Sequence, residues 1–521
     1  MIDKIKFKNY KAFDEGEIEI RPLTFLLGAN SSGKSSILHL FLMLEQTISN
    51  ADKYNAALKT NGHSVSLGED ENLLKDRKRE KQLHLEFGIN AAEYIKNVKA
   101  LQKEIVDNST LQTILLLDRE GFHKYIIKDN KKDSDSIYNL VSILKKRSKN
   151  LDERKWGKKF DYPKQDSFLS SIKSCTNVFD ETFNPSPDSA SIKYVLTFNE
   201  TFQKLKVTEC HVIVGGKVVV KILTKENNSL ILSDIFKKED LDNLTPLSKD
   251  FHFEFDGLSI QSLSEHDNPF TDYIMTLVKQ AFQSVQDFFS KKNMNYVGPL
   301  RANPQRYYIL DDSNSNTTFD HRSGVSLAEV LKKNKSVRDK INNWLKPFEL
   351  NVDVKEFKDV IHNIKVTQNN LLLDIPDVGF GISQVLPILV EGMMAPPSST
   401  IIMEQPEIHL HPKMQAELAD LFIDILQLQT KRKSRINKHL IIETHSEYII
   451  KRIRRRMAEG LISPKDVAIY FVNPRNKEHP DTAEIQLAPI SEDGTIEWPE
   501  EFYMTELEDE MAFFKAKMRK S

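Results

Sequence analysis

The residues with the clearest chemical pattern lie between positions 28 and 36 of this 521-residue chain. They read Gly28-Ala29-Asn30-Ser31-Ser32-Gly33-Lys34-Ser35, which is a glycine, four residues and then Gly-Lys-Ser. In such a P-loop the backbone amides curl around phosphate groups, the lysine reaches the terminal phosphates and the serine hydroxyl coordinates Mg²⁺. The pattern therefore predicts a site for ATP and Mg²⁺. The predicted phosphate-binding residues are Gly28, Asn30, Ser31, Ser32, Gly33, Lys34, Ser35 and Ser36.

The segments on either side of this loop agree with that chemistry. Residues 23–27 are apolar and read as a buried strand, and residues 36–48 read as an apolar helix. A phosphate loop needs a strand before it and a helix after it, because the helix N-terminus favours negative charge. A chance Gly/Ser loop before an ordinary helix is the alternative, and the correct flanks weigh against it.

A second apolar strand, at residues 400–404, ends in a carboxylate. Glu404 is followed by Gln405 and then by Pro406-Glu407-Ile408-His409-Leu410-His411-Pro412. A buried strand that delivers an acid to the magnesium ion is typical of a Walker B element. We therefore expect Ser35 and Glu404 to hold the metal. His409 and His411 are poor metal-ligand candidates, because they are only two residues apart and no further ligands lie nearby.

Two more segments complete the predicted site. The apolar strand 439–443 is followed by His445, which we expect to bond the γ-phosphate and sense its loss; a structural histidine is the alternative. A Gly-rich turn at 378–384 opens an apolar helix just before the Walker B strand. Its position suggests a signature motif that reaches a partner's nucleotide across a dimer, with an ordinary helix start as the alternative. The residues predicted for that contact are Gly381, Ser383 and Gln384.

Composition narrows the class of protein. A chain of 521 residues exceeds a usual single core, so two or more domains are expected. The net charge of −2 gives no bulk attraction to nucleic acid, and two cysteines argue against a disulfide framework or a structural zinc site. The N-terminus lacks the apolar core of a signal peptide, and no apolar run is long enough to cross a bilayer. We expect a cytoplasmic protein.

The order of these motifs predicts three parts of the chain: a split head, an insertion and a tail. Residues 1–50 and 296–505 are predicted to form one split head, and residues 51–295 an insertion with β-rich and helical, arm-like parts. Residues 506–521 are a tail with acidic and basic residues. Residues 1–27 alternate like strands, with a turn expected near residues 14–16. Residues 211–220 predict a hairpin around Gly215-Gly216, and residues 271–290 an amphipathic helix.

Two stretches are basic enough for a role with nucleic acid. Residues 145–164 carry nine lysines and arginines against three acids, and residues 451–456 carry five. Either run could contact phosphate groups or an acidic partner. The alternatives are a solvated surface helix or loop for the first run and the polar face of a helix for the second.

This order of motifs resembles the ABC-type AAA-family ATPase heads of the OLD/RecF/SMC-like group. The opening residues 5–13 add to the resemblance. Within the group, Gly298-Pro299-Leu300-Arg301, residues 404–412 and residues 443–448 resemble PtuA-type ATPases of Septu and retron anti-phage defence systems. The resemblance implies an α/β fold, an ABC-type P-loop head with a mixed sheet flanked by helices and a large α+β insertion. It also implies a homodimer or higher oligomer, formed through a head-to-head ATP sandwich.

The chain departs from the family pattern in two places. The signature-like turn lacks the usual Ser-Gly-Gly spacing, and the residue after the Walker B acid is different. The residue after the Walker B acid is normally Glu, the base that orients the attacking water, and here it is Gln405. An amide cannot accept that proton, so we expect slow hydrolysis unless Glu407 substitutes. The residues predicted for catalysis are Glu404, Gln405, Glu407 and His445.

Three functions are compatible with these features. The first is an ATP-gated control subunit that holds a small HNH-type nuclease in check in a defence complex. In that complex, retron RNA/DNA or duplex DNA is a further potential partner. The second is a RecF/SMC-like ATPase that repairs or tethers DNA, and the third is an ATP-dependent scaffold. A nuclease activity of the chain itself is not expected, because Asp133-Ser134-Asp135 has the spacing of a nuclease motif but lies in a polar stretch without a strand.

Overall fold

The computed structural model of the chain describes most of its residues. The described residues are 2–49, 56–102, 165–225, 228–244, 253–262, 269–301, 303–309, 324–358, 361–427, 438–475, 479, 481–498, 511–513, 515 and 517. The predicted basic run at 145–164, the Asp133-Ser134-Asp135 triplet and the acidic residues 506–510 lie outside them.

A six-stranded sheet forms the centre of the structure. Its strand order is β11–β16–β17–β3–β18–β19, parallel except for the antiparallel edge strand β19. The three central strands β16, β17 and β3 are buried at every position, as expected for parallel strands covered on both faces. The bounds are β11 (Met294–Val297), β16 (Thr400–Glu404), β17 (His439–Glu443), β3 (Leu23–Leu27), β18 (Val467–Asn473) and β19 (Glu484–Leu487).

A second, seven-stranded sheet is antiparallel throughout. Its order is β2–β1–β4–β5–β6–β7–β8, so strands from residues 83–232 continue the sheet that the N-terminal strands begin. The predicted hairpin is confirmed: β6 and β7 meet at Gly215 and Gly216, which both have positive φ. The bounds are β2 (Phe13–Glu19), β1 (Ile2–Tyr10), β4 (Leu83–Ile89), β5 (Ala190–Asn199), β6 (Lys204–Val214), β7 (Lys217–Lys225) and β8 (Asn228–Leu232).

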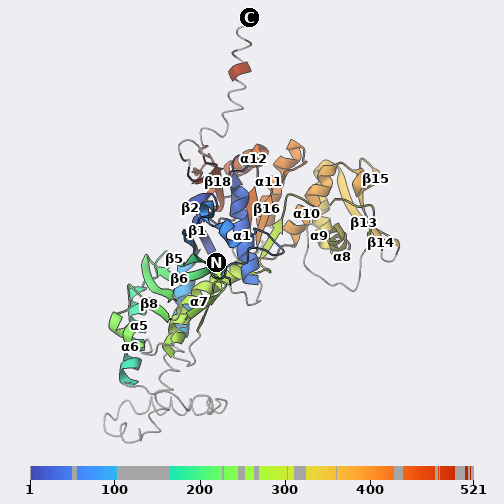
Figure 1. The fold of residues 1–521 in the computed structure, drawn as a ribbon. Coiled ribbons are helices and arrows are strands. Elements are labelled where there is room, and N and C mark those ends of the chain that lie inside the picture. Colours follow the sequence, from blue (N-terminus) through green and yellow to red (C-terminus); the bar gives the residue numbers. More distant parts are fainter. Residues whose placement is uncertain are drawn as a thin grey trace.

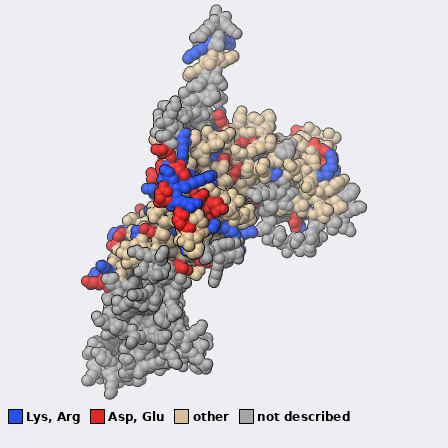
Figure 2. Space-filling model, viewed as in Figure 1, with Lys and Arg blue, Asp and Glu red and all other residues tan. Residues whose placement is uncertain are grey.

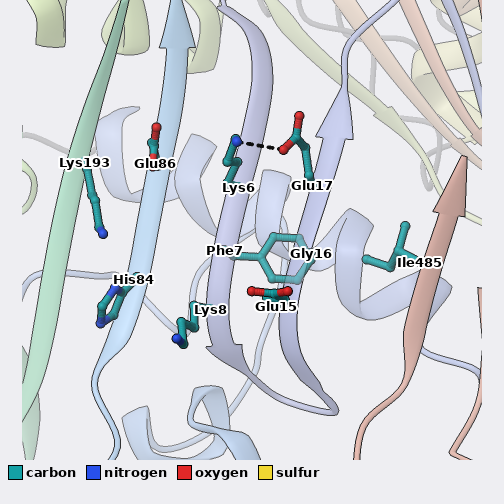
Figure 3. A pocket seen from close by; sticks show the side chains of 10 residues that line it. All are labelled: Lys6, Phe7, Lys8, Glu15, Gly16, Glu17, His84, Glu86, Lys193 and Ile485. Atoms are coloured by element: carbon teal, nitrogen blue, oxygen red, sulfur yellow. Dashed lines mark ion pairs between the residues drawn. The ribbon is translucent and has the colours of Figure 1, made fainter. Parts of the chain in front are cut away.

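The turn predicted near residues 14–16 is wrong. Strand β2 runs straight through these residues, and the turn lies at Lys11 and Ala12. Gly16 pairs across the strands with Phe7, whose ring covers it (Figure 3). A Cβ on Gly16 would lie 2.5 Å from that ring. The glycine therefore makes room for an aromatic side chain and does not bend the chain.

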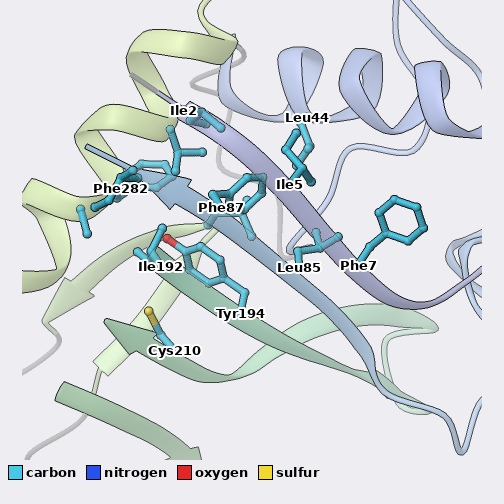
Figure 4. Packing of buried hydrophobic residues seen from close by; sticks show 14 of the residues in the cluster. Ile2, Ile5, Phe7, Leu44, Leu85, Phe87, Ile192, Tyr194, Cys210 and Phe282 are labelled. Atoms are coloured by element: carbon cyan, nitrogen blue, oxygen red, sulfur yellow. The ribbon is translucent and has the colours of Figure 1, made fainter. Parts of the chain in front are cut away.

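Helices α1 (Lys34–Ser49) and α7 (Pro269–Phe289) pack with the seven-stranded sheet to form one hydrophobic core (Figures 1 and 4). Phe289 of α7 joins the layers, because its ring centroid lies 6.1 Å from that of Phe41 on α1 and 5.9 Å from that of Phe87 on β4. The helix predicted at 271–290 is thus confirmed, with its apolar face turned to this core.

A second core covers the other side of the six-stranded sheet. It includes α10 (Phe380–Met394), α11 (Pro412–Gln427) and α12 (Glu447–Ala458). A small unit of sheet and helices extends from α10 to one side (Figure 1). That unit contains α8 (Gly324–Lys333), α9 (Lys335–Leu345), β12 (Tyr308–Ile309), β13 (Leu350–Lys358), β14 (Ile361–Gln368) and β15 (Leu371–Asp374).

The remaining described elements are short or lie beyond the seven-stranded sheet. They include α5 (Gln165–Thr182), α6 (Lys238–Leu244), β9 (Phe253–Asp256), β10 (Ser259–Ser262) and the 3₁₀ turns η1 (Asp70–Leu73), η2 (Lys75–Arg77), η4 (Lys346–Phe348), η5 (Ile375–Asp377) and η6 (Pro464–Asp466). Residues 91–102 are also helical. No helix in the described ranges is both long and apolar enough to span a membrane.

The fold class is confirmed as an α/β P-loop head, with a mixed sheet flanked by helices. The domain boundaries at residues 50 and 296 stay a prediction. Strand pairing crosses the first of them, because Phe7 of β1 lies opposite Leu85 of β4. The segment predicted as an insertion is therefore part of the same sheet as the N-terminal strands.

Phe289→Ala tests the core between α1, β4 and α7. We expect it to lower the free energy of unfolding by about 3–5 kcal/mol, because it leaves a cavity among packed aromatic rings. Phe202→Ala is the matched control, since Phe202 is 51% exposed. Chemical denaturation of both variants measures the difference, and equal effects would contradict the assignment of Phe289 to the centre of the core.

Candidate nucleotide-binding site

The P-loop lies between β3 and α1, as the sequence predicts. Two of its residues must be glycine: a Cβ on Gly28 would lie 2.2 Å from the Val472 carbonyl oxygen, and one on Gly33 would lie 2.7 Å from the Phe13 ring. Both glycines have positive φ, as does Ser31 between them. The loop is therefore closely fitted between β18 and β2, and it leads into the N-terminus of α1, where anions are favoured.

Lys34 is folded back onto the loop. Its ammonium donates to the carbonyl oxygens of Gly28 (3.1 Å) and Ala29 (2.7 Å), and its side chain is 3% exposed. Burial lowers its pKa, and the carboxylate of Glu443, 3.9 Å away, opposes that shift. A charged lysine held this way can exchange two carbonyl contacts for phosphate oxygens.

Ser35 contacts a carboxylate that the sequence prediction did not select. Its hydroxyl donates to both carboxylate oxygens of Glu443, at 3.0 and 3.3 Å. Burial raises the pKa of Glu443, while Ser35 and Lys34 lower it. The sequence held a usable signal, since Glu443 ends an apolar strand in the same way as Glu404.

Glu404 lies at the end of β16, one strand farther from the P-loop than Glu443. Its carboxylate accepts a hydrogen bond from the Tyr296 hydroxyl at 2.9 Å. Arg301 lies beneath the same strand end, where its Nη2 atom donates to the carbonyl oxygens of Glu404 (3.3 Å) and Gln405 (3.2 Å). Burial lowers the pKa of Arg301 to about 10. Tyr296 and Arg301 were not predicted as site residues, because nothing in the sequence shows that β11 lies beside β16.

The loop after β16 is tied to the strand end that carries the predicted switch histidine. Gln405 has a φ of 45°, and its backbone N–H donates to the carbonyl oxygen of Glu443 at 2.8 Å. Both carboxylate oxygens of Glu407 accept hydrogen bonds, from the Thr444 hydroxyl and the His445 backbone N–H, each at 2.8 Å. Burial raises the pKa of Glu407. The structure thus uses Glu407 to fix the backbone at His445.

The His445 side chain is exposed beside this site. Desolvation and, second, the charge of Lys34 lower its pKa, which favours the neutral imidazole. A neutral imidazole can donate one ring N–H to a phosphate oxygen. Its role as a sensor stays a prediction.

The signature-like turn opens α10 beside the loop after β16. A Cβ on Gly381 would lie 3.0 Å from the His409 carbonyl oxygen, so only a very small residue fits there. The side chains of Ser383 and Gln384 are each 3% exposed and lie inside their own chain. A contact between these side chains and a second chain, which stays a prediction, would need this turn to move.

The two histidines of the loop, His409 and His411, are exposed. Within the described ranges, no group of three or more His, Cys, Asp or Glu residues is arranged to hold a metal ion.

Most basic residues of α12 already have acidic partners. Arg452 and Arg456 both pair with Asp420 of α11, and Arg456 also pairs with Glu459. Lys451 pairs with Glu447. The helix therefore matches the alternative of a polar helix face, with most of its cations paired with neighbouring acids.

Positive and negative side chains also lie side by side over β1 and β2 (Figure 2). An open hollow on the outer face of the seven-stranded sheet contains such a pair, with Lys6 2.8 Å from Glu17 (Figure 3). Lys193, Glu86 and His84 line the same hollow. The mixed signs make this face a poor match for the uniform negative charge of a nucleic-acid backbone.

Comparison with known proteins identifies a family for most of the chain. No curated protein matches the chain. Among solved structures, the SMC head domain from Thermotoga maritima is similar at a TM-score of 0.35 and 9% identity, over 94% of this chain and 99% of that one. An SMC head bound to the C-terminal winged-helix domain of ScpA gives 0.35 and 9%, over 93% and 97%. The family model described as an AAA ATPase domain matches residues 1–450, so the chain belongs to this family.

Proposed function

We propose that this chain is an ATP-binding clamp with slow hydrolysis, and that two copies engage head to head around ATP and Mg²⁺. Membership of the AAA ATPase family supports ATP hydrolysis in general. The proposal of slow ATP hydrolysis rests on two residues, Gln405 and Glu407. Gln405 presents an amide where a base is needed, and both oxygens of Glu407 are engaged by Thr444 and His445. Neither residue offers a free carboxylate to the attacking water.

A protein that holds ATP for a long time is better suited to regulating a partner protein than to driving repeated movement. We propose that the closed clamp restrains a separate effector and releases it when nucleotide is lost. The effector that the motifs favour is a small HNH-type nuclease of an anti-phage defence complex. The support is the motif order shared with PtuA-type ATPases, including Arg301, the 404–412 loop and residues 443–448.

Lys34→Ala tests whether the P-loop binds ATP. We expect the affinity for ATP to fall about 100-fold, because hydrogen bonds to charged groups contribute about 1.5–3 kcal/mol each. Calorimetric titration of the full chain measures it. Lys217→Ala, an exposed lysine in the β6–β7 hairpin, is the matched control. Unchanged ATP binding by the Lys34 variant would contradict the proposal.

Gln405→Glu tests why hydrolysis is slow. We expect turnover to rise about 10- to 100-fold, because the new carboxylate can act as general base. Phosphate release measures the rate, and Gln203→Glu adds the same charge at an exposed turn as a control. If the rate stays the same, Glu407 or a residue of a second chain already supplies the base, and the account of a slow clamp is wrong.

The partner is tested by recovering the tagged chain from its native cells with ATP and Mg²⁺. We expect a small nuclease to co-purify, with or without RNA/DNA, and Lys34→Ala to lose it. Recovery of duplex DNA and repair proteins without a nuclease would instead favour a RecF/SMC-like tethering function.

A further inference from the structure

The order of the strands decides which carboxylate faces the predicted metal ligand Ser35. In the six-stranded sheet, β17 lies directly beside the P-loop strand β3, with Glu443 opposite Leu26. Strand β16 follows on the far side of β17, with Glu404 opposite Glu443. Neighbouring strands are about 4.8 Å apart, so the backbone of Glu404 is about twice as far from β3 as that of Glu443.

The positions of the two carboxylates agree with this strand spacing. Glu443 is 4% exposed, and both of its carboxylate oxygens lie within 3.3 Å of the Ser35 hydroxyl. The carboxylate of Glu404 is bonded to Tyr296 of β11, which is the strand on the side of β16 away from the P-loop. The hydroxyl and the carboxylate that are already together are thus those of Ser35 and Glu443.

This donor set fits magnesium. Mg²⁺ prefers hard oxygen ligands, and it is usually held by one or two carboxylates together with phosphate oxygens and water. Ser35 and Glu443 supply a hydroxyl and a carboxylate at the phosphate-binding end of α1. Lys34, 3.9 Å from Glu443, offsets part of the negative charge of this carboxylate.

We propose that Glu443, rather than Glu404, is the carboxylate that completes the magnesium site with Ser35. The proposal rests on the function proposed above, since it concerns the metal that accompanies the bound nucleotide. Glu443 interacts with both Ser35 and Lys34, so it links the metal ligand to the phosphate-binding lysine. Glu404 then contributes to the site from the side of Tyr296 and Arg301.

Two matched substitutions on neighbouring strands separate the two carboxylates. Glu443→Gln and Glu404→Gln each keep the size of the side chain and remove one charge, and circular dichroism checks that both variants fold. Binding of a fluorescent ADP analogue is measured with Mg²⁺ and with a chelator, so the readout does not depend on hydrolysis. Mn²⁺ in place of Mg²⁺ gives a second readout, the electron paramagnetic resonance signal of bound metal.

We expect Glu443→Gln to lose the gain in affinity that Mg²⁺ provides, by about tenfold or more, and to release Mn²⁺ from the bound nucleotide. Glu404→Gln should keep the gain in affinity from Mg²⁺ and should retain the bound Mn²⁺. The opposite pattern, or no change in either variant, overturns the assignment of Glu443 while leaving nucleotide binding intact. If the wild-type chain binds no nucleotide under any of these conditions, the proposed function itself fails, and the assignment fails with it.

Discussion

The hydrogen bond between the Ser35 hydroxyl and the Glu443 carboxylate is the contact on which the site depends. It joins the first turn of α1 to the end of β17, two segments separated by about four hundred positions in the sequence. The contact exists because parallel strands end at the same edge of a sheet, so β3, β17 and β16 bring their last residues to one place. The phosphate loop, the acidic side chains and the histidine meet at that edge.

Two further sets of hydrogen bonds hold the strand ends at this edge together. Glu407 fixes the backbone at His445, and the Gln405 N–H bonds the Glu443 carbonyl oxygen, so the loop after β16 cannot shift without moving the end of β17. Arg301, in the segment after β11, bonds the carbonyl oxygens of Glu404 and Gln405 in the same loop. These hydrogen bonds connect the end of β17 to the loop after β16, and that loop packs against the signature-like turn at Gly381.

The sequence predicts the local parts of the site well, because their chemistry is local. Gly28, Gly33 and Lys34 form the expected loop, and the strands before Gly28 and up to Glu404 form as expected. What the sequence does not give is the order of the strands. Without knowing that β17 lies between β3 and β16, the sequence analysis selected Glu404 and did not consider Glu443, which the structure places against Ser35. The contacts of Tyr296 and Arg301 with the end of β16 were missed for the same reason.

In the fold, too, local features were predictable from the sequence and contacts between distant segments were not. The hairpin at Gly215 and Gly216 was predictable from two residues, whereas the turn expected at residues 14–16 was wrong, since Gly16 serves to accommodate the ring of Phe7 from another strand. The pairing of β1 with β4 was also outside the reach of the sequence, because no local pattern records which edge strand joins which.

A crystal structure of the chain with Mg²⁺ and a non-hydrolysable ATP analogue tests the central claim most directly. The account predicts phosphates over residues 28–36, Lys34 turned from the Gly28 and Ala29 carbonyl oxygens to the phosphates, and the metal on the side of Ser35 and Glu443. A nucleotide bound elsewhere, or a metal on Glu404 with the Ser35–Glu443 hydrogen bond unchanged, would contradict it.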